Sequence, residues 1–128
     1  MRIIERIRLI GLILFILLVS ATALAQEYDV VYVVDGDTAD VLVDGEKVRL
    51  RFLDINTPER GEDGYQEAKD FVKDMILDKC VRIETRGKGY YGRTLAYIFY
   101  DGIELNEQLY CLGYAERYRR SKREFNCK

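Results

Sequence analysis

Residues 38–53 of the chain read TADVLVDGEKVRLRFL, and this stretch decides the fold. In residues 38–43 apolar and polar side chains alternate, which is typical of a strand with one buried face. Asp44-Gly45 is a strong hairpin signal, and residues 47–53 alternate again. Because successive strand residues point to opposite faces, one face of the second strand carries Val48, Leu50 and Phe52. The other face carries Arg49, Arg51 and Leu53.

Three further segments have the composition of strands. β-branched and aromatic side chains are frequent in residues 28–34 (YDVVYVV), 81–85 (VRIET) and 94–100 (TLAYIFY). The first of them ends at Asp35-Gly36 and the last at Asp101-Gly102, and both dipeptides are turn signals. Together with the hairpin, these segments predict five short strands.

Two segments have helical periodicity. Between residues 65 and 76, apolar side chains recur every three or four positions, at Tyr65, Ala68, Phe71, Val72, Met75 and Ile76. Residues 103–112 predict a shorter helix that stops before Gly113, and Asn106 within it is expected to be a structural hydrogen-bonder. Five strands and two helices in this order predict an α+β chain, mostly β, built as a five-stranded Greek-key barrel of the OB type.

The first 25 residues differ from the rest of the chain. Arginines in residues 1–8 precede an unbroken apolar run at 9–19, and Ala23-Leu24-Ala25 is an A-x-A cleavage motif. The run is shorter than the roughly 20 residues that a membrane-spanning helix needs. We therefore expect residues 1–25 to be a signal peptide, with an uncleaved membrane anchor as the alternative, and residues 26–128 to form the domain. The protein would be secreted, or anchored to the outer face of the cell membrane.

The overall charge does not favour a nucleic-acid partner. Residues 1–25 contribute three arginines and one glutamate, so the formal net charge changes from −2 to −4 when they are left out. Because phosphate affinity comes from lysine and arginine, a nucleic-acid role must rest on local charge. Residues 114–128 are locally basic and form either such a patch or a solvated tail.

The chain contains no histidine, which removes the commonest general base and the commonest zinc ligand. Its three cysteines lack C-x-x-C spacing, so a zinc site is not expected. Export would permit one disulfide and leave one thiol over. The sequence leaves open which pair forms among Cys80, Cys111 and Cys127.

Three separated stretches carry reactive groups, namely residues 35–38 (DGDT), 54–60 (DINTPER) and 91–93 (YGR). With Arg51, they offer oxygens for a hard cation and two guanidinium groups for a phosphate. They also offer a carboxylate that could accept a proton from a water molecule. Tyr90 and Tyr91, beside Gly89 and Gly92, could stack on an unpaired base or pack in the core. These groups suit the cleavage of a phosphodiester.

Five motifs resemble those of the thermonucleases, the staphylococcal-nuclease-like, calcium-dependent enzymes, and stand in the same order. They are residues 34–38 (VDGDT), 51–59 (RFLDINTPE), 64–68 (GYQEA), 91–97 (YGRTLAY) and 105–107 (LNE). The resemblance covers roughly residues 28–118. It implies an OB-fold barrel that hydrolyses DNA and RNA, prefers single-stranded or melted substrate, and holds calcium in its site.

The resemblance also implies roles for particular residues. Asp37 and Asn56 would bind calcium through their side chains, Thr57 through its backbone carbonyl, and Asp35 through water. The catalytic positions would be those of Arg51, Glu59 and Arg93. Tyr91 would pack against the nucleotide, with Tyr90 beside it. Nucleic acid is the expected partner, and no obligate protein partner is expected.

Two features depart from the thermonuclease pattern. Asn56 stands where the family usually has aspartate, which removes one negative charge from the expected calcium site. The family's last helix is expected to be short or missing here. These departures motivate two alternatives, namely a weak or inactive module that binds single-stranded nucleic acid without cutting it, and a product that does not fold stably.

Overall fold

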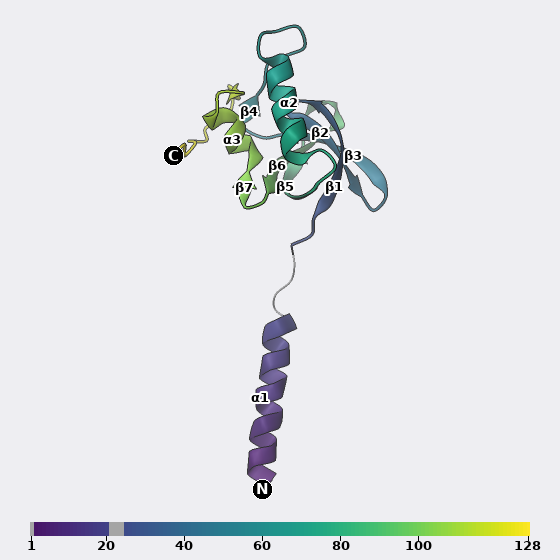
Figure 1. Ribbon diagram of the computed structural model, residues 1–128, viewed down its shortest axis with the longest axis vertical. Coiled ribbons are helices and arrows are strands. Elements are labelled where there is room, and N and C mark those ends of the chain that lie inside the picture. The colour runs from purple at the N-terminus through teal and green to yellow at the C-terminus, as the bar shows by residue number, and fades with distance from the viewer. Residues whose placement is uncertain (1, 21–24) are drawn as a thin grey trace.

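The structure is a computed structural model that describes residues 2–20 and 25–128 (Figure 1). Its elements, in chain order, are α1 (Arg2–Ser20), β1 (Tyr28–Asp35), β2 (Thr38–Val43), β3 (Glu46–Phe52), β4 (Ile55–Asn56), α2 (Tyr65–Ile76), β5 (Cys80–Lys88), η1 (Tyr90–Gly92), β6 (Thr94–Tyr100), β7 (Ile103–Glu104), α3 (Leu105–Cys111) and β8 (Glu116–Arg117).

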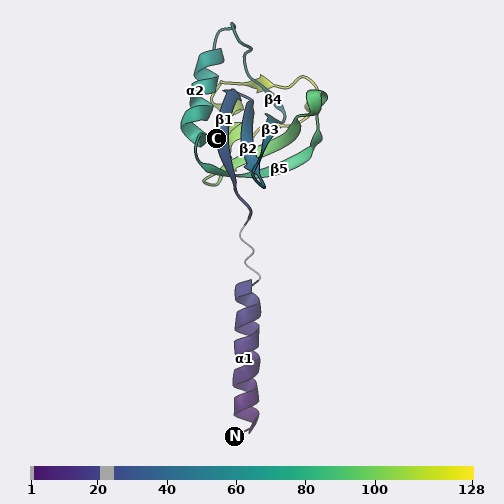
Figure 2. The same cartoon turned by 90° about the vertical axis from the view of Figure 1, so that its right-hand side faces the viewer.

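Within residues 25–128, five strands close into a mixed barrel. They follow the order β3-β2-β1-β5-β6, and a parallel pairing of β3 with β6 completes the ring. The short strand β7 continues the sheet beyond β6, while β4 and β8 pair separately. Figure 2 shows β1, β2 and β3 side by side, with α2 along one flank of the barrel. The predicted five-stranded OB-type barrel is confirmed.

The core follows the alternation of the hairpin. Leu50 and Phe52 are fully buried, whereas Arg51 between them faces the other way. α2 buries Ala68, Val72 and Ile76 against the barrel. Each large side chain that is buried in this way stabilises the fold by about 1.5–3 kcal/mol. These contacts fix β3, and with it the direction of Arg51.

The helix predicted over residues 103–112 starts two residues later, at Leu105. Asp101 and Gly102 both adopt positive φ, 51° and 76°, which is the geometry of a tight hairpin turn. Ile103 and Glu104 therefore pair back onto β6 as β7. The Glu104 carboxylate then accepts a hydrogen bond from the backbone N–H of Glu107 and caps α3.

Asn106 ties α3 to two strands of the barrel. This fully buried side chain accepts a hydrogen bond from Ile98 N at 3.0 Å. Its amide nitrogen donates to Leu53 O at 3.0 Å and to Ala96 O at 3.1 Å. Because Leu53 leads into residues 54–60, Asn106 fixes the start of that segment. Its predicted role as a structural hydrogen-bonder is confirmed.

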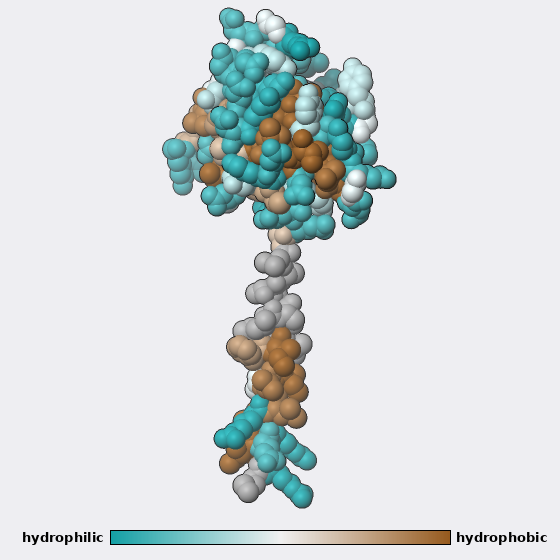
Figure 3. Space-filling view, turned by 45° about the vertical axis from the view of Figure 1, so that its right-hand side comes forward, coloured by the Kyte–Doolittle hydropathy of each residue, from teal (hydrophilic) through white to brown (hydrophobic). Residues whose placement is uncertain are grey.

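The N-terminal segment is a helix whose apolar side chains are exposed. α1 lies apart from the barrel, and residues such as Ile3 and Phe15 are exposed over more than half of their surface (Figures 1 and 3). Among residues 2–20 and 25–128, no helix combines the length and hydropathy that a membrane span requires. Ala23 and Leu24 of the expected cleavage motif lie outside the described residues, so the boundary at residue 25 stays a prediction.

The C-terminal residues lie against α3. Cys111 and Cys127 form a disulfide, and Cys80 is an exposed free thiol in the described chain. Residues 112–128 contain no helix, as expected from the sequence. They are not a solvated tail, however, because Phe125 stacks on Tyr110 with ring centroids 4.2 Å apart.

We predict that Asn106→Leu lowers the free energy of unfolding by about 3 kcal/mol, because it leaves buried backbone groups of Ile98 and Leu53 unpaired at a cost of about 1–3 kcal/mol each. Denaturant unfolding monitored by circular dichroism measures this change in the free energy of unfolding. Gln66→Leu is the control, since Gln66 is exposed and its hydrogen bond to Asp70 lies on the surface. Equal stabilities for the two variants would contradict the role of Asn106.

Candidate functional site

A cavity lies where the acidic turn of residues 35–38, β3 and η1 meet. Its volume is about 750 Å³. Its lining residues are Asp35, Asp37, Arg51, Phe52, Leu53, Asp54, Ile55, Asn56, Glu59, Lys88, Gly89, Tyr90, Tyr91, Arg93, Leu95, Tyr118 and Arg120. The cavity thus draws its side chains from segments that are far apart in the sequence.

The turn between β1 and β2 is bound to the segment that follows β3. Asp37 is almost fully buried, and its Oδ2 accepts a hydrogen bond from the backbone N–H of Thr57 at 3.0 Å. Its Oδ1 accepts from the hydroxyl of Thr38. A side chain at Gly36 would come within 2.8 Å of Ala68 Cβ and Thr57 Cγ2. Glycine is therefore needed for this close approach.

Asp35 is a half-buried carboxylate beside Asp37. Its Oδ1 accepts a hydrogen bond from the backbone N–H of Asp37 at 3.0 Å. Burial and the negative charge of Asp37 raise the pKa of Asp35 to about 6. Two carboxylates held so close favour a cation between or beside them.

Arg51 lies between the two side chains that were predicted to bind calcium. Its Nη2 donates to Asn56 Oδ1 at 3.2 Å and is 3.4 Å from Asp37 Oδ2. Its Nη1 donates to the carbonyl of Phe52. The side chain is 13% exposed, so the guanidinium is largely withdrawn from water. Arg51 neutralises Asp37 in this arrangement.

Arg93 enters the same cavity from the start of β6. Its Nε is buried, and among the described residues this atom has no hydrogen-bond partner. Its guanidinium lies 5.8 Å from the centre of the Tyr91 ring. A buried donor without a partner is costly, so an acceptor such as a phosphate oxygen would be stabilised here.

The two tyrosines of η1 are exposed, at 73% for Tyr90 and 93% for Tyr91. Packing of either ring in the core is therefore excluded. Tyr91 has a positive φ of 67°, which turns the chain sharply before Arg93. The rings flank the cavity as open aromatic faces.

The segment after β3 presents Asn56 and Glu59 to the cavity, and both residues are exposed. Thr57 does not line this cavity. It is buried, and its hydroxyl has no hydrogen-bond partner in the part of the chain that the structure describes. Of the residues predicted for the site, Thr57 lines an adjoining cavity of about 610 Å³ together with Asn56, and the others meet in the first cavity.

The oxygens in this cavity fit a hard cation such as calcium. Asp37, Asn56 and Asp35 supply carboxylate and amide oxygens, which are the ligands that calcium prefers. In the described ranges, no three Asp, Glu, His or Cys residues form a metal-binding cluster. Arg51 would compete with a cation for Asn56 Oδ1 and Asp37 Oδ2.

Nine lining residues were not singled out from the sequence as site residues, among them Lys88, Leu95, Tyr118 and Arg120. Arg120 belongs to the locally basic residues 114–128, so the charge pattern contained a signal for it. The phenol oxygen of Tyr90 raises the pKa of Arg120 above its usual value. Lys88 and Arg120 add positive charge around the exposed tyrosines.

Three relatives illustrate the similarity to known proteins. The thermonuclease of Staphylococcus hyicus is 38% identical over 92 residues, which are 66% of this chain and 54% of that protein. The micrococcal nuclease of Shigella flexneri is 35% identical over 66% of this chain and 49% of that protein. An uncharacterized endonuclease of Haemophilus influenzae is 32% identical over 84% of this chain and 61% of that protein.

The chain thus spans about half to three fifths of the length of these relatives. The staphylococcal nuclease homologue family matches residues 49–128, which include Arg51, Asn56, Glu59 and Arg93. The barrel agrees with this match. The chain belongs to the staphylococcal nuclease family.

Proposed function

We propose that the protein is a calcium-dependent nuclease that hydrolyses phosphodiester bonds of DNA or RNA. The observation that carries the proposal is the meeting of Arg51, Arg93 and Glu59 with the acidic turn in one cavity. Membership of a nuclease family supports the reaction class and a nucleic-acid substrate. Calcium and the choice of substrate belong to the proposal.

Two guanidinium groups would bind the phosphate under attack. Arg93 offers a buried N–H that no described residue accepts. Arg51 offers a guanidinium that donates to Asn56 and lies 3.4 Å from Asp37. As water attacks phosphorus, negative charge accumulates on the phosphate oxygens. Guanidinium forks match paired phosphate oxygens and stabilise that charge.

Glu59 would assist the attacking water. It is an exposed carboxylate on the cavity wall, and the chain has no histidine to act as a base. Pro58 restricts the backbone before Glu59 and so helps to aim this side chain. Glu59 would either accept the proton or hold the water in line with the phosphate.

The acidic turn and Asn56 would hold the cation. Asp37 and Asn56 would contribute side-chain oxygens, Thr57 its backbone carbonyl, and Asp35 would act through water. Bound calcium would supply positive charge to the phosphate oxygens. The raised pKa of Asp35 supports a site whose negative charge is unfavourable without a counter-ion.

The exposed tyrosines would select unpaired bases. Tyr90 and Tyr91 present open rings beside Lys88 and Arg120, and stacking on an aromatic ring contributes about 1–3 kcal/mol per base. Bases are accessible for stacking only where strands are separated. Single-stranded or melted substrate is therefore the preferred form.

A second candidate is a module that binds single-stranded nucleic acid without cutting it. Two observations favour it. Asn56 brings no charge to the cation site, and Arg51 is already engaged by Asp37 and Asn56. The exposed tyrosines and basic residues would serve binding equally well. Only the release of products distinguishes the two functions.

We also propose that the protein acts outside the cytoplasm, secreted or anchored to the outer face of the cell membrane. The Cys111–Cys127 disulfide supports this, because disulfides persist in oxidising compartments. The apolar, exposed face of α1 supports an export segment that is either cleaved or retained as an anchor. No obligate protein partner is proposed.

We predict that the protein releases acid-soluble nucleotides from denatured DNA in calcium, and that a chelator or Arg51→Ala abolishes the release. Removing one group that stabilises the transition state lowers the rate about 10²–10³-fold. The control is Arg49→Ala on the same strand. Arg49 pairs with Asp40 and does not line the cavity, so that variant stays active. Binding of denatured DNA without release would instead support the binding module.

We predict that Arg93→Lys loses about 10²-fold or more in kcat, because a lysine ammonium is a point charge that cannot replace a planar fork. Steady-state kinetics on a single-stranded oligonucleotide measures this. The matched control is Arg86→Lys, an exposed arginine on β5 that lies outside the cavity, and it should keep its rate. Full activity of Arg93→Lys would contradict bidentate phosphate binding.

We predict that Asn56→Asp binds calcium more tightly than the natural chain, because a carboxylate adds one charged ligand. Isothermal titration with calcium, in the absence of nucleic acid, measures the affinity. Asn126→Asp, at an exposed position outside the cavity, controls for the change in net charge. Equal or weaker binding by Asn56→Asp would show that Asn56 is not a ligand.

A further inference from the structure

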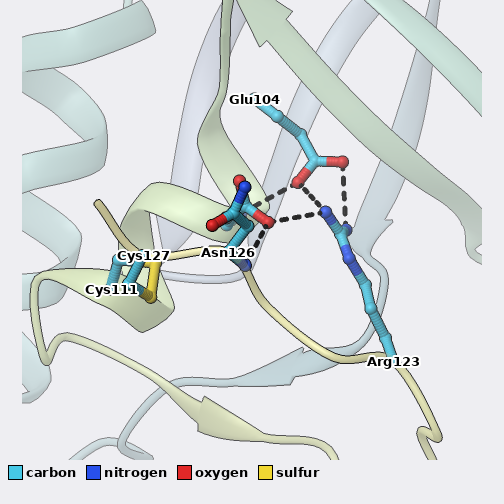
Figure 4. The surroundings of a disulfide bond; sticks show 6 residues. Glu104, Cys111, Arg123, Asn126 and Cys127 are labelled. Carbon is cyan, nitrogen blue, oxygen red and sulfur yellow. Dashed lines mark hydrogen bonds and ion pairs between the residues drawn. A yellow bond between two sulfur atoms is a disulfide. The ribbon is translucent and has the colours of Figure 1, made fainter.

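The residues after α3 lie beside the segment that follows β3. We call residues 114–127 the C-terminal segment and residues 54–57 the corner. The C-terminal segment leaves α3, passes the corner, and returns to α3 at the Cys111–Cys127 disulfide (Figure 4). Its side-chain contacts with the corner are concentrated on Asp54, and its strand β8 pairs with Ile55 and Asn56.

Asp54 is held by side chains from two directions. Ser121 donates its hydroxyl to Asp54 Oδ1 at 2.9 Å, from the C-terminal segment. Tyr97 donates its hydroxyl to Asp54 Oδ2 at 2.6 Å, from β6. The backbone carbonyl of Asp54 accepts from Tyr118 N at 2.8 Å. Both carboxylate oxygens of Asp54 thus accept hydrogen bonds. Neither is directed at the oxygens of Asn56 and Asp37 that are proposed to bind a cation.

Arg123 connects Asp54 to α3. Its guanidinium makes a bidentate pair with Glu104, at 3.0 and 2.7 Å, and donates to Glu107 at 3.2 Å (Figure 4). It also lies 3.8 Å from Asp54 Oδ2. The backbone N–H of Asn126, next to the disulfide, donates to Glu107. The polar network therefore runs from the disulfide to the corner.

The barrel holds the corner at its two ends and through three side chains, since Tyr97 donates to Asp54, Arg51 donates to Asn56, and Ile55 is buried in the core. The strand pairing of the corner comes from the C-terminal segment. Leu53 N donates to Ala96 O before the corner, and Thr57 N donates to Asp37 at its end. Between them, Asp54 has a positive φ of 67° and β4 pairs only with β8 of the C-terminal segment. Asn56, paired with Glu116, is therefore positioned by that segment.

We propose that Asp54 is a positioning residue, which ties the corner carrying Asn56 and Thr57 to a C-terminal segment closed by the Cys111–Cys127 disulfide. The proposal deepens the proposed function, on which its importance for catalysis rests. Asp54 touches neither substrate nor reacting atoms in this scheme. It acts by holding the corner where Asn56 and Asp37 both contact Arg51.

The state of Tyr97 supports this role. Burial and the hydrogen bond to Asp54 raise the pKa of Tyr97 to about 12. The phenol therefore keeps its proton at neutral pH and continues to donate it to the Asp54 carboxylate. Opening of the disulfide would leave this bond in place and release the bonds that come from the C-terminal segment.

Amide hydrogen exchange of Thr57 N–H tests the proposal, because this group closes the corner onto Asp37. All proteins carry Cys80→Ser, so that the reductant acts only on the disulfide. We expect Cys111→Ser with Cys127→Ser, or reduction of the parent, to accelerate Thr57 exchange by about tenfold or more. Amides inside α2 and the β2–β3 hairpin should change by less than about twofold.

A matched pair of variants separates positioning from general stability. Arg123→Gln and Arg49→Gln each remove a guanidinium that makes two hydrogen bonds to one carboxylate, that of Glu104 and that of Asp40. Only Arg123→Gln should accelerate Thr57 exchange. Asp54→Ala should do the same, and Asp54→Asn should restore most of the protection, because asparagine tolerates positive φ and keeps one acceptor.

Two results would overturn the proposal. One is an unchanged Thr57 exchange rate after the disulfide is opened. The other is an equal acceleration of all slow amides, which indicates global destabilisation alone. Neither readout depends on nuclease activity. A protein that cuts no DNA but shows the local effect would refute the proposed function and leave the positioning role standing.

Discussion

The hydrogen bond from Thr57 N–H to Asp37 Oδ2 is the contact on which the site depends. It joins a turn between two strands to a segment that follows a third, and so brings the acidic groups next to Arg51. The bond needs the close approach that Gly36 permits beneath Thr57 and α2. It is buried, so losing one partner would leave the other unsatisfied at a cost of about 1–3 kcal/mol. The contact that positions the site is therefore also part of the buried core of the fold.

The protein itself balances the charges around this bond only in part. Asp37 is compensated by Arg51, while Asp35 beside it has a pKa raised to about 6. Arg93 carries a buried donor that the described residues do not satisfy. The cavity therefore holds one unfavourable negative group and one unfavourable donor. A cation and a phosphate would relieve both, which is why a nucleic-acid substrate fits this chemistry.

Local patterns predicted the barrel, and the reactive motifs predicted eight of the seventeen residues that line the cavity. Contacts between residues far apart in the sequence were not predicted. The alternation of residues 47–53 placed Leu50 and Phe52 inside and Arg51 outside, because one register satisfies a half-buried strand. The pairing of Cys111 with Cys127 and the bond from Ser121 to Asp54 join residues whose proximity no periodicity encodes. The helix start at Leu105 was missed because a tight turn at residues 101–102 overrode helical spacing.

Asp54 cannot replace the charge that Asn56 lacks, although it lies only two residues away. Both of its oxygens are bound, one by Ser121 and one by Tyr97, so the carboxylate faces the C-terminal segment and not the cation oxygens. The amide of Asn56 also holds Arg51 less strongly than a carboxylate would, since hydrogen bonds between charged partners are about twice as strong. In the proposed calcium-dependent enzyme, asparagine at position 56 would therefore both weaken the cation site and release Arg51 more readily. With asparagine in place of aspartate at position 56, the chain would bind calcium less tightly, and Arg51 would be more readily available to a phosphate.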